Sequence, residues 1–250
     1  MSITLLSLLG VIAAGTYIQT ATGFGFGLIV MGVGGALGLL PIADLAFIAS
    51  TLSLVNGVSG LYGGVWRHAM FRQMLVFLMA ALPMVVVGLY WLNHLGQFGL
   101  NALQALLGVV MILVCVSSLL RPEPRATQSP AWHFGLSGAF AGVLSGLFST
   151  AGPPISYLMY RQPVELVVIR STLLSVFLVL ASFRTSTAMF NGMVTEAMWT
   201  VSFIGAPLVL LGTYVSRRYL LSMVPAKAVR RLAMSMLSLS GLILLIKALY

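Results

Sequence analysis

The sequence predicts an all-α polytopic membrane protein made of two inverted repeats, and three observations support this fold class. The chain of 250 residues is 60% hydrophobic and only 7% charged, whereas soluble domains carry about 25% charged residues. Long apolar runs follow one another along the whole chain. A proline-rich polar linker divides these runs into halves that resemble each other. Each half is expected to hold a glycine-broken helix hairpin followed by three transmembrane helices.

The apolar runs supply the spanning elements. A transmembrane helix needs about 20 mostly apolar residues. Runs of that length, or nearly so, lie at 3–21, 24–40, 43–64, 73–92, 99–120, 133–149, 166–190, 197–216 and 228–249. The segment 155–160 is too short to cross alone, so we expect residues 133–160 to enter the membrane, turn and return.

The first hairpin, 3–40, contains a polar and glycine-rich break. Gln19, Thr20 and Thr22 lead directly into Gly23 and Gly25. Glycine costs a helix about 1 kcal/mol per position relative to alanine. Inside a membrane, broken backbone is tolerated only where protein buries it or where it lines a wet cavity. This break is therefore a candidate binding site.

The second hairpin, 133–160, breaks in the same manner, and we place its turn near residues 152–154. The candidate residues here are Ser149, Thr150, Gly152, Pro153 and Pro154. A pair of interrupted apolar segments in corresponding halves is typical of secondary transporters, whose sites lie near the bilayer midplane.

The halves are the repeats 1–120 and 132–250, joined by the linker 121–131. Several features recur in the same order after each hairpin: Ser50 and Thr51 match Ser171 and Thr172, and Pro83 with Gly88 matches Pro207 with Gly212.

The charge distribution predicts the orientation. The net charge of +9 comes from Lys and Arg in short loops between apolar runs, which is typical of cytoplasmic loops and unlike a nucleic-acid-binding stripe. The basic loops share one side only if 133–160 is re-entrant. Both termini then lie outside and the linker lies in the cytoplasm. Full crossing by 3–21 and 24–40 would leave the sidedness unchanged, so both depths stay open for that hairpin.

Catalytic signatures are absent from the sequence. The acids Asp44, Glu123, Glu165 and Glu196 fall at run ends or in loops, so no carboxylate pair can perform acid–base chemistry within the bilayer. The histidines lie in or beside loops, and Cys115 is the only cysteine. We expect no enzyme activity, no metal site and no cofactor.

The polar groups left in the interior favour an anion. A cation path normally offers carboxylates, whereas this interior offers hydroxyls, amides, backbone N–H groups and the guanidinium of Arg184. An ionisable group within a span is a functional candidate, although the Arg184 side chain could also extend to the interface. Gln19 and Asn56 are candidate lining residues. The Ser–Thr pairs could instead serve helix packing.

These motifs resemble the TauE/SafE-type sulfite exporters over essentially the whole chain. The resemblance rests on Gln19-x-x-x-Gly23-Phe24-Gly25 and on Gly146-x-x-x-x-x-Gly152-Pro153-Pro154. It implies a multi-pass permease of the bacterial inner membrane that moves sulfite, sulfonates or similar organosulfur anions outward. The central site implied by the resemblance comprises Gln19, Gly23, Gly25, Gly152, Pro153 and Pro154. Ala151 stands where many relatives have glycine, and the first hairpin lacks a Pro-Pro pair.

The sequence thus predicts a secondary transporter of a small anion that works by alternating access. A passive anion channel and a non-transporting membrane scaffold are the alternatives. The partners expected are the anion and the lipid bilayer, with a homodimer permitted but not required.

Overall fold

The computed structural model describes residues 3–98, 100–119, 126–220 and 226–249, and these contain helices and no strand. The helices are α1 (Ile3–Thr22), α2 (Phe26–Ala36), α3 (Ile42–Leu61), η1 (Val65–His68), α4 (Phe71–Phe98), α5 (Leu100–Leu119), α6 (Ala131–Phe148), α7 (Gly152–Met159), α8 (Leu166–Phe190), α9 (Glu196–Val215), the π-helical turn η2 (Ser216–Leu220) and α11 (Ala226–Leu249). The fold is therefore all-α, as the composition predicts. Residues 121–125 of the predicted linker lie outside the described part.

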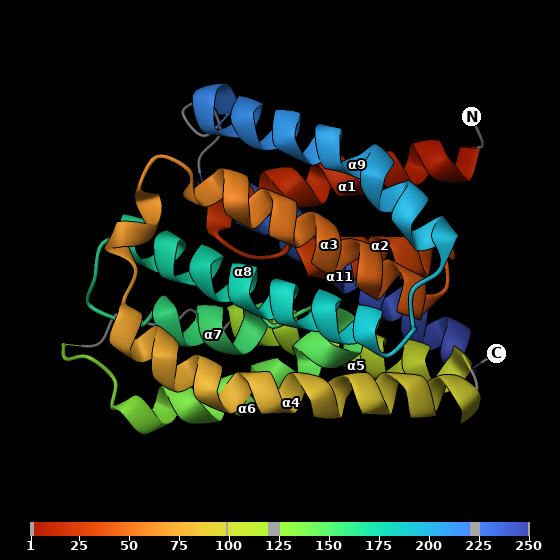
Figure 1. Cartoon of the computed structure of the whole chain (residues 1–250), viewed down its shortest axis with the longest axis horizontal. Coiled ribbons are helices and arrows are strands. Elements are labelled where there is room, and N and C mark those ends of the chain that lie inside the picture. The colour runs from red at the N-terminus through yellow and green to blue at the C-terminus, as the bar shows by residue number, and fades with distance from the viewer. Residues whose placement is uncertain (1–2, 99, 120–125, 221–225, 250) are drawn as a thin grey trace.

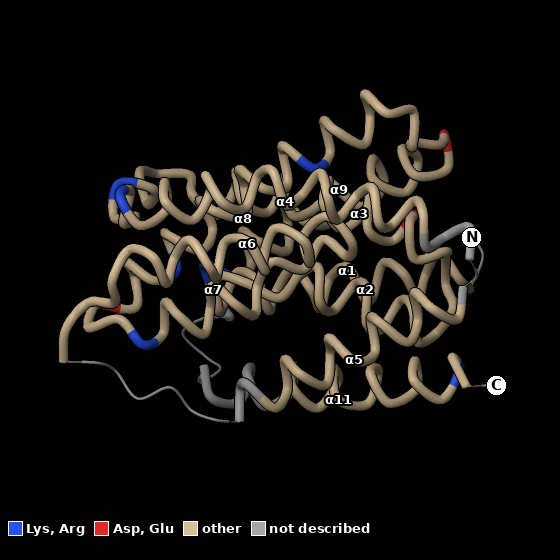
Figure 2. The backbone as a smooth tube through the Cα atoms, turned by 90° about the horizontal axis from the view of Figure 1, so that it is seen from below, with Lys and Arg blue, Asp and Glu red and all other residues tan. Residues whose placement is uncertain are grey.

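The helices run roughly along one long axis, and the N- and C-terminal ends lie at the same end of the bundle (Figure 1). The opposite end carries most of the Lys and Arg residues that the structure describes (Figure 2). We call it the basic end; η1, the start of α8 and the end of α9 lie there. Placing both termini on one side agrees with the predicted path of the chain.

Six helices of the described part are long and apolar enough to cross a membrane: α1, α3, α4, α6, α8 and α9. The partner of α1 in the first hairpin is short. At 1.5 Å per residue, α2 with its 11 residues covers only about 16 Å. The apolar run 24–40 is thus not a full crossing, because the helix ends at Ala36 with Gly38 in a left-handed conformation (φ 63°) and Leu39 N–H bonded back to Gly34 O.

The second hairpin turns slightly earlier than the sequence suggests. The chain leaves α6 at Ser149, which has φ 55°, and α7 begins at Gly152. Pro153 and Pro154 lie in the first helical turn, where a missing N–H costs nothing. The turn therefore occupies residues 149–151 rather than 152–154.

Glycines on α6 bring its backbone directly against α4. Gly138, Gly142 and Gly146 lie four residues apart, and a Cβ on any of them would collide with a backbone carbonyl of α4. Small residues at this spacing permit such close helix contacts in membranes. Gly146, which begins the second motif of the sequence resemblance, thus has a packing role in addition to any role at the break.

The apolar core is divided in two. One cluster lies around α1, α2, α3 and α5, and the other around α4, α6, α7 and α8. Phe24, in the break of the first hairpin, packs against both clusters. The breaks therefore lie where the two halves of the core meet.

Candidate functional site

The two helix breaks lie against each other. A Cβ on Gly27, in the first turn of α2, would collide with the carbonyl oxygen of Ser149 in the other break. A Cβ on Gly152 would lie 3.1 Å from the ring of Phe24, and the Tyr160 hydroxyl donates to Thr22 O at 3.0 Å. The structure thus brings the two broken segments into direct contact.

The first break leaves buried backbone donors open. Gly23 and Gly25 take φ values of 83° and 106°, a region that suits glycine. Within the described part of the chain, the backbone N–H groups of Gly25, Phe26, Gly27 and Leu28 donate no hydrogen bond. Phe26 and Leu28 are fully buried. An open helix N-terminus of this kind presents donors and a positive dipole end, which favours anions.

Thr150 of the second break lies beside these donors. Its Cγ2 is 3.6 Å from the Cβ position of Gly27, so its hydroxyl, carried by the same Cβ atom, also lies near the first turn of α2. Thr150 is 2% exposed and its Oγ1 has no hydrogen-bond partner. A buried polar atom without a partner is uncommon and calls for a ligand or water.

Arg184 is buried in the body of the protein rather than extended to the surface. Its side chain is 1% exposed. Nε donates to Ser145 O (2.8 Å) and Gly146 O (3.2 Å), at the C-terminal end of α6, and Nη1 donates to Ala46 O (3.0 Å). Nη2 has no partner among the described residues. The guanidinium thus stabilises the broken end of α6 and keeps one nitrogen free.

A short chain of hydroxyls links Arg184 to the crossing of the breaks. Nη1 of Arg184 also donates to Ser50 Oγ at 2.9 Å. Ser50 Oγ in turn lies 2.8 Å from Ser149 Oγ. Because Ser149 O contacts Gly27, one chain of contacts connects Arg184 with the open donors of α2. We call Arg184, Ser50, Ser149, Thr150 and the first turn of α2 the crossing site.

Three further predicted residues form a second polar cluster. Gln19 exchanges hydrogen bonds with Ser53 of α3 (3.2 and 3.3 Å). Asn56 Nδ2 donates to Thr20 Oγ1 (3.2 Å) and to Thr213 Oγ1 of α9 (2.9 Å). Among the described residues no hydrogen bond joins this cluster to Arg184, so the structure separates residues that the sequence groups together.

The remaining predicted residues have local partners. Thr22 Oγ1 lies 2.8 Å from Ile18 O and 2.7 Å from Phe24 O, which holds the first break. Thr51 and Ser171 bond to carbonyls of their own helices. Thr172 accepts a bond from Met70 N–H at 2.9 Å. Neither Ser171 nor Thr172 contacts the crossing site, although their dipeptide repeats that of Ser50 and Thr51.

Sequence reasoning did not assign Gly27, Ser53, Tyr160 or Thr213 to the site. Gly27 continues the alternating glycines, and Ser53 lies midway between Ser50 and Asn56 at helical spacing. Those two signals were available. Nothing in the sequence marks Tyr160 or Thr213, because their contacts with Thr22 and Asn56 cross between distant segments.

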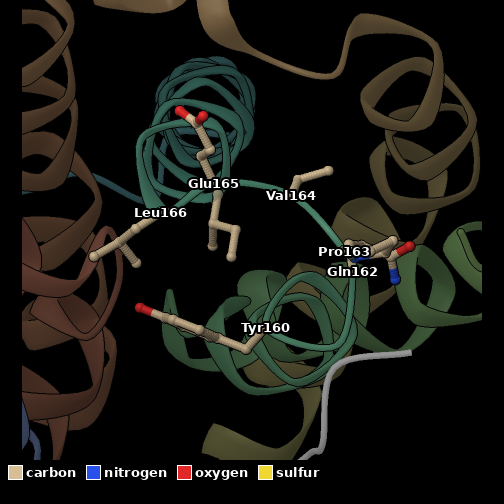
Figure 3. Close-up of a pocket in the computed structure, with 7 residues that line it drawn as sticks. Tyr160, Gln162, Pro163, Val164, Glu165 and Leu166 are labelled. Atoms are coloured by element: carbon tan, nitrogen blue, oxygen red, sulfur yellow. The ribbon is translucent and has the colours of Figure 1, made fainter. Parts of the chain in front are cut away.

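A pocket of about 550 Å³ lies at the corner between α7 and α8, lined by Tyr160, Gln162, Pro163, Val164, Glu165, Leu166 and Ile169. In Figure 3 the Glu165 carboxylate and the Tyr160 hydroxyl point in different directions. The Gln162 side chain accepts a hydrogen bond from Ser129 N–H (2.9 Å) and donates one to Ser129 Oγ (2.9 Å). This lining is mostly apolar and its charged side chain is an acid, so the pocket is unsuited to holding an anion.

Comparison with known proteins identifies the family. The chain is 38% identical over 244 residues to the "Probable sulfite/organosulfonate exporter TauE" of Cupriavidus necator, with 98% of this chain and 94% of the relative covered. It is 29% identical over 189 residues to the "Probable inner membrane transporter protein TsaS" of Comamonas testosteroni, with 74% and 76% covered. No solved structure matches. The sulfite exporter TauE/SafE family model matches residues 7–244, and the chain therefore belongs to this family of membrane transport proteins, which are not enzymes.

Proposed function

We propose that the protein is a secondary transporter that exports a small anion carrying an –SO₃ group, sulfite or an organosulfonate, across the bacterial inner membrane. The anion binds at the crossing site. The observation that carries this proposal is Arg184: a fully buried guanidinium, held by backbone carbonyls, connected to a helix N-terminus whose N–H groups are open.

The charge of the site favours an anion over a cation. A charged side chain within a bilayer is costly unless it is paired or lines a path. Arg184 has no carboxylate among its partners; it contacts Ser145, Gly146, Ala46 and Ser50. In a low-dielectric interior such a charge attracts an anion strongly. A bound anion would neutralise it.

The donors of the site match an –SO₃ group. Sulfite and sulfonates present three acceptor oxygens, and the crossing site offers donors from more than one direction. These are the N–H groups of the first turn of α2, the Thr150 hydroxyl and Nη2 of Arg184. The name of the C. necator relative supports the same chemical class.

The packing of the helices supports a two-repeat transporter. Each central helix packs on its counterpart in the other half: α3 on α8, and α5 on α11. The pair α4 and α6 has its counterpart in α9 and α1. We propose that the repeats are inverted, with the termini outside and the basic end in the cytoplasm by the positive-inside rule. Alternating access would move one hairpin-bearing half against the other.

Thermal stabilisation of the detergent-purified protein tests the substrate. A ligand that binds the native state raises the melting temperature once its concentration exceeds the dissociation constant. The panel is sulfite, sulfate, thiosulfate, sulfoacetate, taurine, acetate and chloride. We expect a selective shift for an –SO₃ anion. A flat panel together with no anion flux in proteoliposomes would contradict the proposal and favour a scaffold role.

Flux measurements separate a transporter from a passive channel. Uptake of the selected anion into proteoliposomes should saturate with its concentration if each cycle requires a conformational change. Flux that rises linearly with concentration would identify a channel instead.

A further inference from the structure

A line of polar residues leads along α3 from the crossing site to the basic end. Ser50, Ser53, Asn56 and Ser59 lie three residues apart, so each neighbours the next on the helix surface, and the row winds around α3 from one side to the other. Ser53 faces Gln19 of α1, and Asn56 faces both Thr20 of α1 and Thr213 of α9. Ser53 and Asn56 therefore lie in the seam where α1, α3 and α9 meet, which we call the α1–α3–α9 seam.

Asn56 has an uncompensated acceptor in the middle of this seam. The Thr20 and Thr213 hydroxyls donate to carbonyls of their own helices, Thr16 O and Val209 O. They can therefore only accept from Asn56, which fixes Nδ2 toward them. Asn56 is 0% exposed, and its Oδ1 has no partner. Leaving a buried acceptor unpaired costs about 1–3 kcal/mol, so pure helix packing does not explain this side chain.

The seam ends at an exposed cation and an irregular helical turn. Arg217 Nη1 donates to Ser59 O (3.0 Å) and Tyr62 O (3.4 Å), bridging the ends of α9 and α3. The π-helical turn η2, Ser216–Leu220, follows α9 directly. Such turns are rare and are frequent at functional sites. An exposed guanidinium at the mouth of a polar seam is placed to attract an anion.

We infer that the α1–α3–α9 seam is the half of the anion path that joins the crossing site to the basic end, closed in this structure. The inference rests on the proposed function. When α9 separates from α1 and α3, the side chains of Ser53 and Asn56 line a wet path, and water or the passing anion's hydration shell satisfies Asn56 Oδ1. The pocket at Glu165 is not on this path.

Cysteine accessibility tests the path without reference to the natural substrate. Cys115 is the only cysteine of the chain, so Cys115→Ala gives a background free of thiols. Ser53→Cys and Asn56→Cys are introduced singly, with Val58→Cys as the matched control. Val58 lies on the same helix, is 54% exposed on the outer surface of the bundle, and would face lipid. Val164→Cys reports on the pocket.

Inside-out vesicles, which present the cytoplasmic face, are treated with methanethiosulfonate ethylsulfonate, an anionic and membrane-impermeant thiol reagent. Only the thiolate reacts, and apolar surroundings raise the pKa of a thiol. We expect Asn56→Cys and Ser53→Cys to react at least about tenfold faster than Val58→Cys, the ratio that corresponds to one pKa unit. Gel filtration checks that each variant is folded. If Asn56→Cys does not fold, the conservative variant Ser53→Cys alone tests the seam.

Labelling of both seam positions no faster than that of Val58→Cys would overturn the inference and leave the polar line as helix packing. Fast labelling of Val164→Cys with an unreactive seam would also overturn it, in favour of entry through the pocket. The outcome is independent of the substrate panel: a reactive seam, with a flat anion panel and no anion flux in proteoliposomes, would contradict the proposed function and leave the seam as a wet path.

Discussion

The two helix breaks differ in how they compensate their interrupted backbone. At the first break, neutral groups satisfy the end of α1: Gly23 N–H bonds to Gln19 O, and Tyr160 donates its hydroxyl to Thr22 O. At the second break, a full positive charge satisfies the end of α6, because Arg184 donates to Ser145 O and Gly146 O. The helices that follow differ as well.

The two short helices offer different numbers of donors. The first turn of α2 presents open N–H groups from Gly25 to Leu28. In α7, Pro153 and Pro154 lie in the first turn and have no N–H to offer. The comparison teaches that the breaks differ in what they would offer to a ligand: the first has open backbone donors, and the second holds the charge of Arg184 from α8. In the proposed site an anion would use both, and they meet where Gly27 contacts Ser149.

Replacing Arg184 should have the largest effect, because it removes the charge that α8 places at the second break. Arg184→Gln leaves the α6 carbonyls without a cationic donor. One hydrogen bond to a charged group contributes about 1.5–3 kcal/mol, and we expect the free energy of unfolding to fall by more than that. The thermal shift that sulfite induces should also be lost. In Arg184→Lys the side chain cannot reach Ser145 and Ser50 at once, so this variant should be less stable than the unmodified protein. Because it keeps the positive charge, it should keep part of the sulfite-induced shift. A full sulfite response in Arg184→Gln would remove Arg184 from the site.

Gly27→Ala should disrupt the contact between the breaks. The added methyl group collides with Ser149 O, and forcing extra volume into a packed core costs about 1–3 kcal/mol. Anion flux in proteoliposomes should fall sharply. Gly10→Ala is the control, since a Cβ there has nothing within 4 Å and alanine favours a helix. Equal flux in both variants would show that the contact is unimportant.

Two substitutions at Ser149 separate its backbone from its hydroxyl. Ser149→Gly relieves the left-handed conformation, which costs non-glycine residues roughly 1–2 kcal/mol, but removes the link to Ser50. Ser149→Ala removes the link and keeps the strain. We expect Ser149→Gly to melt at a higher temperature than Ser149→Ala, and both to bind sulfite more weakly than the unmodified protein. Unchanged sulfite affinity in both would exclude a role for the hydroxyl.

Tyr160→Phe should have the smallest effect, because it removes one neutral hydrogen bond to the first break. A bond of this kind contributes about 0.5–1.5 kcal/mol. The melting temperature should fall slightly, while the sulfite-induced shift stays intact. Tyr62→Phe, at a side chain 80% exposed, should change neither quantity. Complete loss of sulfite binding in Tyr160→Phe would contradict this ranking, because it would mean that binding depends on the Tyr160 bond as well as on the backbone donors of the first break.

The fold class and the breaks could be predicted, and Arg184 could be singled out as a candidate, because each leaves a local mark in the sequence. Apolar runs define the spans, alternating glycines mark the first break, and a lone arginine within a span is conspicuous. The length of α2 could not be predicted from composition, since the chain stays apolar through Leu40 although the helix ends before Gly38.

The grouping of polar residues required the structure. Ser50 and Thr51 look equivalent to Ser171 and Thr172, yet Ser50 contacts Arg184 while Thr172 accepts from Met70. Asn56 could be recognised as a candidate lining residue, but its partner Thr213 lies 157 residues away. Side-chain contacts between distant helices depend on packing angles, which local sequence does not encode.

The most direct test of the crossing site is to locate a bound anion. Selenite has the shape and charge of sulfite, and its selenium atom scatters anomalously. A crystal structure with selenite, measured at the selenium edge, should show one strong peak within hydrogen-bond reach of both the first turn of α2 and Arg184. A peak elsewhere, at a selenite concentration that stabilises the protein, would contradict the account.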